Sequence, residues 1–289
     1  MAVRELTTLP GTATLYSRAV LGSLAGKSGK ELPALELVLR DVKIDRANLA
    51  AYNRVCGFSQ RDTLPVTYGF VLGFPLHMSL MTDPSFPFAA MGMVHIQNRI
   101  TQHRLVSASE TLTIVVKPAN LRPHDKGVQF DILTTLISGD EVVWECASTM
   151  LRRQSGGGVD GTRPATPRKD KQSSHATAIV QWTIPGDIGR RYGAISGDRN
   201  PIHMYAFTAR LFGFPRAIAH GMWSKARCLA AMEGRIPDAC TVDVQFKLPV
   251  LLPAKVAFHS EPQADGSYTF GLNDSRSGKP HLAGSIQAA

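Results

Sequence analysis

The chain has 289 residues, of which 44% are hydrophobic and 19% charged, and its formal net charge is +9. Such a chain can bury a substantial core in one large or two modest domains, which excludes an intrinsically disordered protein. The positive charge is explained either by a solvated basic surface or by attraction to an anionic partner. Nucleic acid is the weakest candidate for that partner, because the lysines and arginines form no dense stripe with interleaved aromatic residues.

The cysteine pattern and the apolar stretches predict a cytoplasmic protein. Four cysteines are scattered with no C-x-x-C pair, which favours reduced thiols over a disulfide framework or a zinc site. No apolar core typical of a signal peptide follows Arg4 and Glu5. The most apolar window, residues 66–81, contains Pro75 and His77 and is shorter than the roughly 20 residues that a membrane span needs. It therefore predicts a buried helix and no membrane insertion.

The first half of the chain opens with small and polar residues. Residues 15–24 have a helical pattern, but a surface arm is the preferred interpretation of residues 1–30. Residues 35–42 predict a strand, and residues 48–56 predict an amphipathic helix that ends at Gly57. The remaining elements expected in this half are a long apolar helix at 67–82 and a hairpin of strands at 128–137 and 141–150.

The second half opens with a break in the pattern. Residues 154–176 are rich in Gly, Ser, Pro and Lys and predict a flexible linker. A basic tail for nucleic acid is the alternative, but Asp160 and Asp170 offset its charge. Residues 187–196 predict an amphipathic helix that ends at Gly197. The remaining elements expected here are a long helix at 220–232 and a hairpin of strands at 267–272 and 281–286.

The two halves resemble each other. The pattern Y-x-x-[VI]-[CS]-G occurs at Tyr52 and again, 140 positions later, at Tyr192. The segment around Gln97 matches the segment around Gln245, 148 positions later, and glycines bracket both hairpins at similar offsets. Landmarks in the same order predict two copies of one unit of about 140 residues. Each copy has more strands than helices, so we expect an α+β unit in which an antiparallel sheet packs against one central helix.

The second copy contains a segment with the groups for acid–base chemistry, SGDRNPIH at residues 196–203. Turn-forming residues and Pro201 can aim Asp198 and His203 at one small volume. Downstream, Gly221 opens a helix and leaves a backbone N–H that suits a developing oxyanion. Taken singly, Asp198 is explained as a turn residue and His203 as a structural histidine. Together with Gly221 they indicate chemistry beside a thioester carbonyl.

These residues carry a family resemblance. The stretch YGAISGDRNPIH at residues 192–203, followed by Ala209, resembles the hydratase 2 motif of MaoC-like (R)-specific enoyl-CoA hydratases. The segments FGFP at 212–215 and IAHGM at 218–222 are similar to that family too. The whole chain resembles the bacterial double-hotdog 3-hydroxyacyl-thioester dehydratases, in which two hotdog units on one chain imitate a dimer of single-unit hydratases.

The resemblance implies a division of labour between the halves. Residues 1–153 would form a non-catalytic hotdog unit that binds the acyl chain, residues 154–176 the linker, and residues 177–289 the catalytic hotdog unit. It also implies a reversible dehydration of (3R)-hydroxyacyl thioesters to trans-2-enoyl thioesters, on coenzyme A or acyl carrier protein, in fatty-acid metabolism. The expected protein is a monomer or a homodimer, and nucleic acid is not an expected partner.

The resemblance also implies the roles of the site residues. Asp198 and His203 would be the catalytic pair that holds one water, and the Gly221 N–H would polarise the thioester oxygen. The residues expected to support them or to contact substrate are Ser196, Asn200, His220 and Met222. No metal is expected, and no cofactor beyond the coenzyme A or phosphopantetheine that the substrate carries.

Two alternatives remain at this stage. A hotdog thioesterase usually has a carboxylate on its central helix, whereas the second copy has none there before Glu233. A non-catalytic module that binds acyl thioesters is the other alternative. Some single-unit hydratases support the catalytic Asp with a serine of the central helix. This chain has Arg227-Cys228-Leu229 there, so another donor must orient Asp198 or the support is absent.

The first copy departs from the motif. No Asp directly follows Gly57 and no His comes after it, which predicts one active site per chain. His77 stands where the second copy is expected to have His220 and Gly221, and we interpret it as a core or tunnel-wall histidine. Small residues of the first copy can leave room for an acyl chain, although core packing explains them equally well: Gly69, Gly73, Ala89, Ala90 and Gly92.

Overall fold

The computed structural model describes residues 2–9, 11–24, 29–153 and 178–289. The predicted linker at 154–176 lies outside the described residues. The strands are β1 (Ala2–Leu6), β2 (Leu35–Lys43), β3 (Val94–Gln102), β4 (Thr111–His124), β5 (Gly127–Ser138), β6 (Glu141–Arg153), β7 (Ala178–Ile184), β8 (Cys240–Phe246), β9 (Ala254–Pro262), β10 (Tyr268–Asp274) and β11 (Pro280–Ala288). The helices are α1 (Thr12–Leu24), α2 (Arg46–Cys56), α3 (Tyr68–Thr82), α4 (Ile188–Ser196), α5 (Pro201–Met204), α6 (Ala206–Arg210) and α7 (Gly221–Ala230).

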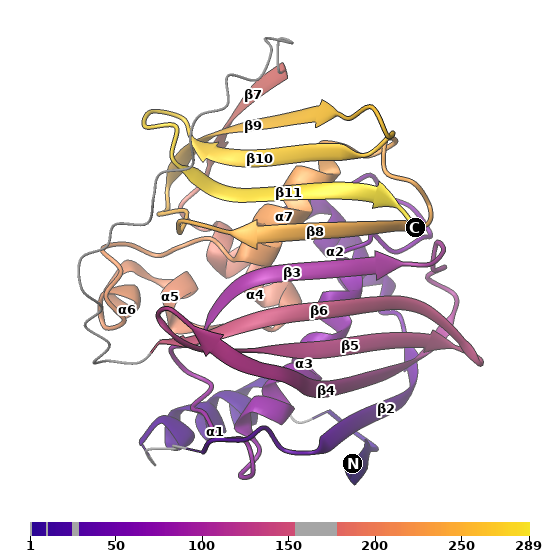
Figure 1. Cartoon of the computed structure of the whole chain (residues 1–289), viewed down its shortest axis with the longest axis vertical. Helices are drawn as coiled ribbons and strands as arrows, with labels where there is room; N and C mark the ends of the chain where they lie inside the picture. The colour runs from indigo at the N-terminus through magenta and orange to yellow at the C-terminus, as the bar shows by residue number, and fades with distance from the viewer. Residues whose placement is uncertain (1, 10, 25–28, 154–177) are drawn as a thin grey trace.

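The described strands form one continuous sheet in the order β1-β2-β4-β5-β6-β3-β8-β11-β10-β9-β7. Two units with the same topology make up this sheet. In chain order, the five strands of each unit lie as first, third, fourth, fifth and second, in β2–β6 and again in β7–β11. The sheet curves around the helices α2, α3, α4 and α7, which lie on one face (Figure 1). The predicted α+β double-hotdog fold is confirmed.

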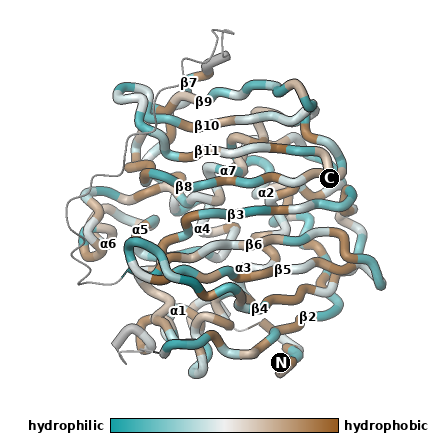
Figure 2. Tube along the Cα trace, viewed as in Figure 1, coloured by the Kyte–Doolittle hydropathy of each residue, from teal (hydrophilic) through white to brown (hydrophobic). Residues whose placement is uncertain are grey.

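Strands β3 and β8 join the two units. They pair antiparallel, and Gln97 lies directly opposite Gln245. These are the two residues that the sequence repeat equates, so the pair lies at the point about which one unit maps onto the other. In the first half of β4, buried residues alternate with more exposed ones, the expected period of two. Figure 2 shows hydrophobic and hydrophilic residues along the strands of the sheet.

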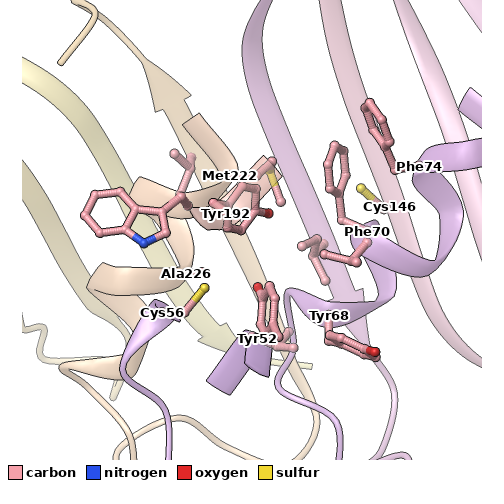
Figure 3. Packing of buried hydrophobic residues seen from close by; sticks show 14 of the residues in the cluster. Tyr52, Cys56, Tyr68, Phe70, Phe74, Cys146, Tyr192, Met222 and Ala226 are labelled. Carbon is pink, nitrogen blue, oxygen red and sulfur yellow. The ribbon is translucent and has the colours of Figure 1, made fainter. Parts of the chain in front are cut away.

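The predicted ends of the short helices are confirmed. Helix α2 ends at Gly57, with φ of 86°, and α4 ends at Gly197, with φ of 77°. Both glycines adopt the left-handed conformation that a side chain disfavours. The rings of Tyr52 and Tyr192, the equated tyrosines of α2 and α4, lie 6.2 Å apart in the centre of the molecule. Figure 3 shows them where the cores of the two units meet.

Helix α3 lies close to the sheet of the first unit. A Cβ at Gly69 would lie 2.8 Å from the ring of Trp144, and one at Gly73 would lie 2.9 Å from Thr134. These glycines therefore allow close packing of helix on sheet, and the alternative interpretation of them as room for an acyl chain is wrong.

The position of His77 also needs correction. Helix α3 begins at Tyr68 and α7 at Gly221. Alignment of these helix starts equates Thr67 and Tyr68 with His220 and Gly221, whereas His77 lies about two and a half turns further along α3. The sequence comparison matched the histidines of the two central helices and not the helix starts, so it placed His77 beside His220.

The amino-terminal segment is not a surface arm. Residues Thr12–Leu24 form helix α1, in which Leu15 and Ala19 are buried. Contacts with α3 bury this face of the helix, and β1 extends the sheet by pairing in parallel with β2. The preferred interpretation of residues 1–30 is therefore wrong, because long-range packing of a short apolar stripe decided the outcome.

A buried lysine ties α7 to the junction of the two units. The Lys225 amine donates hydrogen bonds to the main-chain oxygens of Asn98 on β3 and Val242 on β8, and to the Asn98 side chain. Burial lowers the pKa of Lys225 to about 7. Because all three N–H donors have acceptors, the amine is satisfied in the core without a bonded carboxylate.

The cysteines and the apolar helix agree with the sequence-based predictions. All four cysteines are free and buried, at Cys56, Cys146, Cys228 and Cys240. In the described part of the chain, no helix is both long and apolar enough to cross a membrane.

Candidate functional site

The segment after α4 forms the predicted turn. The Asp198 N–H donates to Ser196 Oγ at 3.2 Å, and the Asn200 N–H donates to Asp198 Oδ1 at 3.2 Å. Asn200 Oδ1 then accepts from the Ile202 N–H at 3.4 Å and caps α5, whose first residue is Pro201. His203 lies in the first turn of α5 and is buried.

Two histidines stack beside Asp198. The rings of His203 and His220 lie 3.7 Å apart at 27°. His203 Nδ1 lies 2.8 Å from the Ile218 carbonyl, and His220 Nε2 lies 2.9 Å from the Asp198 carbonyl. Each of these nitrogens faces a main-chain acceptor and so carries the proton of the neutral ring. His203 Nε2 is consequently left as an acceptor.

Asp198 receives a hydrogen bond that the sequence did not predict. The Tyr16 hydroxyl of α1 donates to Asp198 Oδ1 at 3.1 Å, and the same oxygen of Tyr16 accepts from the Arg199 N–H at 2.6 Å. The donor missing from Arg227-Cys228-Leu229 is therefore supplied from the other end of the chain. No local motif signals it, because 182 positions separate the two residues.

Burial and local contacts set the protonation of the site. Burial raises the pKa of Asp198, but the His220 and His203 rings and the donors Asn200 N–H and Tyr16 outweigh it, so the pKa lies below its usual value. Burial lowers the pKa of His203, opposed in part by Asp198, and lowers that of His220 to about 3. Near neutral pH the site therefore holds an ionised carboxylate and two neutral rings.

Gly221 is the first residue of α7, and His220 precedes the helix in an extended conformation. The N–H groups of a first helical turn have no intrahelical acceptor. A Cβ at Gly221 would lie 3.0 Å from the Phe246 ring, so this ring covers the glycine closely. Gly221 and the buried Met222 line the same cavity as Asp198 and His203.

That cavity, of about 740 Å³, is lined by both units. The second unit contributes Asp198, His203 and Gly221, and the first contributes residues of α3, β3, β5 and β6. Its wall in the first unit includes Phe70, Phe74, His77, Met81, Ile132 and Met150. Three exposed basic residues lie at its rim, Lys126, Arg153 and Lys247, and among the described lining residues Asp198 alone carries a carboxylate. The opening is thus positively charged.

The small residues and His77 have distinct places around the cavity. Gly92 lines it, whereas Ala89 and Ala90 are not among the lining residues. His77 forms part of the wall, and its Nε2 lies 2.6 Å from Thr134 Oγ1. Burial lowers the pKa of His77 to about 3. These positions agree with the interpretation of His77 as a wall residue, distant in sequence from the motif.

Asp198, His203 and His220 are also of the types that bind metals, and one possible ligand atom from each lies within 4.8 Å of the others. Two ring nitrogens, His203 Nδ1 and His220 Nε2, instead face main-chain carbonyls. The remaining His220 nitrogen, Nδ1, is buried and has no partner among the described residues. A zinc or iron site needs three or four converging ligands. Two of the four ring nitrogens are thus held by main-chain acceptors, which is consistent with an acid–base role for this group.

Comparison with known proteins agrees with this geometry. Residues 162–275 match the family model described as MaoC like domain. Over 257 residues the chain is 39% identical to a Mycobacterium tuberculosis protein named 3-hydroxyacyl-thioester dehydratase X, covering 89% of this chain and 90% of the relative. The chain belongs to the MaoC-like dehydratase family.

Solved structures place this MaoC-like chain among double-hotdog proteins. The crystal structure of HtdX from Mycobacterium tuberculosis matches with a TM-score of 0.76 and 37% identity, covering 88% of this chain and 100% of that one. A second Mycobacterium tuberculosis protein, described as a double hotdog fold, matches with a TM-score of 0.54 and 16% identity over 86% of this chain and 94% of that one. The latter likeness concerns the fold alone.

Proposed function

We propose that this MaoC-like protein is a hydro-lyase that reversibly dehydrates (3R)-hydroxyacyl thioesters to trans-2-enoyl thioesters. The observation that carries the proposal is the convergence of Asp198, His203 and the start of α7 on one cavity. The relative named 3-hydroxyacyl-thioester dehydratase X supports the reaction class, as does the family match. The setting of such a reaction is fatty-acid metabolism.

The geometry suggests how the residues share the chemistry. In hydration, Asp198 and His203 Nε2 hold one water, whose oxygen adds to C3. Asp198 acts on this water by accepting a hydrogen bond from the O–H that the product keeps. His203 orients the water, takes its other proton on Nε2 and passes that proton to C2. The Gly221 N–H stabilises the charge that collects on the thioester oxygen. Dehydration reverses these steps. Asn200 and Ser196 hold the turn, His220 positions His203 by stacking, and Met222 contacts the acyl group.

The first unit supplies space for the acyl chain in this proposal, and the second supplies the chemistry. The cavity wall in the first unit supports this division, since it is built largely from apolar and aromatic side chains. The basic rim suits an anionic carrier, either the phosphates of coenzyme A or an acidic acyl carrier protein. The protein acts as a monomer or a homodimer in the cytoplasm.

The test is a turnover assay with crotonyl-CoA and longer 2-enoyl thioesters on both carriers. We expect loss of the ultraviolet absorbance of the enoyl thioester, formation of the (3R)-hydroxyacyl product, and no release of free thiol. Release of thiol without hydration would instead identify a thioesterase. That outcome is disfavoured because α7 contains no carboxylate residue. Tight binding of thioesters without turnover would identify a non-catalytic module.

Removal of metals provides a second test. If Asp198 and His203 act as acid and base, dialysis against a chelator should leave turnover unchanged, and no added cofactor should raise it. A tenfold or greater loss that zinc or iron restores would contradict the proposed mechanism. Metal analysis of the purified protein before and after dialysis is the control.

A further inference from the structure

Tyr16 lies on α1, outside both five-stranded units, yet its hydroxyl reaches the carboxylate of the turn at Asp198. The hydroxyl makes two hydrogen bonds there, as donor to Asp198 Oδ1 and as acceptor from the Arg199 N–H. It therefore fixes both the side chain of Asp198 and the peptide that follows it. Burial, followed by the Asp198 carboxylate, raises the pKa of Tyr16, so the hydroxyl keeps its proton and remains a donor.

The rest of the helix holds Tyr16 in place. Leu15 and Ala19 are buried against α3, with exposed fractions of 3% and 1%. The tyrosine is thus presented from an anchored helix rather than from a free terminus. Tyr16 is absent from the residues that line the cavity, so its contact with the site is made through Asp198 and Arg199.

The remaining contacts of Asp198 show what Tyr16 adds. Oδ1 also accepts from the Asn200 N–H at 3.2 Å, and Oδ2 lies 3.8 Å from His220 Nε2. Among the described residues, Tyr16 supplies the only side-chain hydroxyl bonded to this carboxylate. A hydrogen bond to the ionised form of a carboxylate both orients it and favours ionisation.

We infer that Tyr16 is a positioning residue of the active site, through which α1 orients the Asp198 carboxylate and keeps it ionised for the reaction. This inference rests on the proposed function for its catalytic consequence. It also assigns a role to the amino-terminal helix, which precedes the first hotdog unit and contributes to the site of the second.

The experiment compares Tyr16→Phe with wild type and with Ser17→Ala, a matched control on the same helix. Among the described residues, the Ser17 hydroxyl bonds the Ala13 carbonyl alone. For Tyr16→Phe we expect kcat/KM for hydration to fall about 10- to 100-fold. In a plot of kcat/KM against pH, the fall in rate at low pH (the acid limb) should move to higher pH by about one pH unit in this variant. Ser17→Ala should match wild type, and circular dichroism should show all three proteins folded.

A second readout does not depend on turnover. Carbon-13 NMR of labelled aspartate, assigned with Asp198→Asn, follows the titration of Asp198 in each protein. Tyr16→Phe should raise the pH at which Asp198 titrates, and Ser17→Ala should not. An unchanged titration and an unchanged acid limb in Tyr16→Phe would overturn the inference. If wild type hydrates no thioester but the titration moves, the proposed function fails while the positioning contact stands.

Discussion

At the scale of single residues, burial shifts the pKa values of both Asp198 and His203, but the groups that surround the two side chains differ. Asp198 keeps its charge because four neighbouring groups favour the carboxylate over the buried acid. His203 is neutral because burial of its ring lowers its pKa by more than the Asp198 carboxylate and the hydrogen bond from Nδ1 to the Ile218 carbonyl raise it. The pair is thus ready to accept a proton from water without first releasing one.

These protonation states predict the pH dependence of hydration. Because the pKa of His203 lies below its usual 6.5 and that of Asp198 below 3.8, the site takes up its inactivating proton only at low pH. We expect kcat/KM to be flat through neutral pH, with the midpoint of the acid limb below 6.5. Crotonyl-pantetheine, which lacks phosphate groups, removes the titration of the carrier from the measurement. A midpoint above pH 7 would contradict the assigned states.

The sequence predicted the local part of this site well. Asp198, Asn200, Pro201 and His203 form the turn and helix start that their side chains favour, because such contacts span only a few residues. Tyr16 was missed because its contact depends on how α1 packs on α3, and no periodicity encodes that.

At the scale of elements, the start of α7 matters most for the proposed reaction, because it carries the Gly221 N–H. His220 has φ of −64° and ψ of 136°, and Gly221 begins the helix. A residue before proline favours this extended conformation, and proline is well tolerated at the first position of a helix. The backbone is therefore suited to a substitution that deletes one N–H and leaves the helix in place.

Gly221→Pro and Gly221→Ala form a matched pair that tests the N–H. Both add a Cβ about 3.0 Å from the Phe246 ring, but only proline removes the N–H. We expect Gly221→Pro to reduce kcat by a further 10²- to 10³-fold relative to Gly221→Ala, because one oxyanion donor is lost. Equal rates for the two variants, with equal melting temperatures, would contradict the role of this N–H.

The elements themselves were largely predictable, and their misassignments have identifiable causes. Alternation of apolar and polar residues and the positions of glycines predict several elements correctly. These are strand β2, the hairpins β5–β6 and β10–β11, and the ends of α2 and α4. Gly69 and Gly73 were ambiguous, because small residues in a helix serve close packing and open space equally well in sequence. Only the close approach of α3 to the sheet, at Trp144, decides between these two interpretations.

At the scale of the whole molecule, two copies of one unit share one sheet and one cavity. The β3–β8 pairing fixes their relation and places Gln97 opposite Gln245, the two residues that the sequence repeat equates. The second unit alone carries the motif, whereas in the first unit α2 and α3 are joined by a shorter connection without it. The asymmetry assigns catalysis to one unit and acyl binding to the other in the proposed function.

A substitution in the first unit tests this division. Met150 on β6 is half-buried and lines the cavity, far along the chain from the motif. Met150→Trp should reduce kcat/KM at least tenfold for long-chain enoyl thioesters by filling acyl space, and leave crotonyl thioester unaffected. Val142→Trp, at an exposed position of the same strand, is the control. An equal loss for short and long chains in Met150→Trp would contradict the division.

The most direct test of the central claim is turnover by Asp198→Asn and His203→Gln, measured with crotonyl-CoA for hydration and with (3R)-hydroxybutyryl-CoA for dehydration. Each substitution keeps the size of the side chain and removes its acid–base function. We predict that both proteins remain folded by circular dichroism and that each loses about 10²- to 10⁴-fold in kcat. Turnover near the wild-type rate in either folded variant would contradict the assignment of the active site.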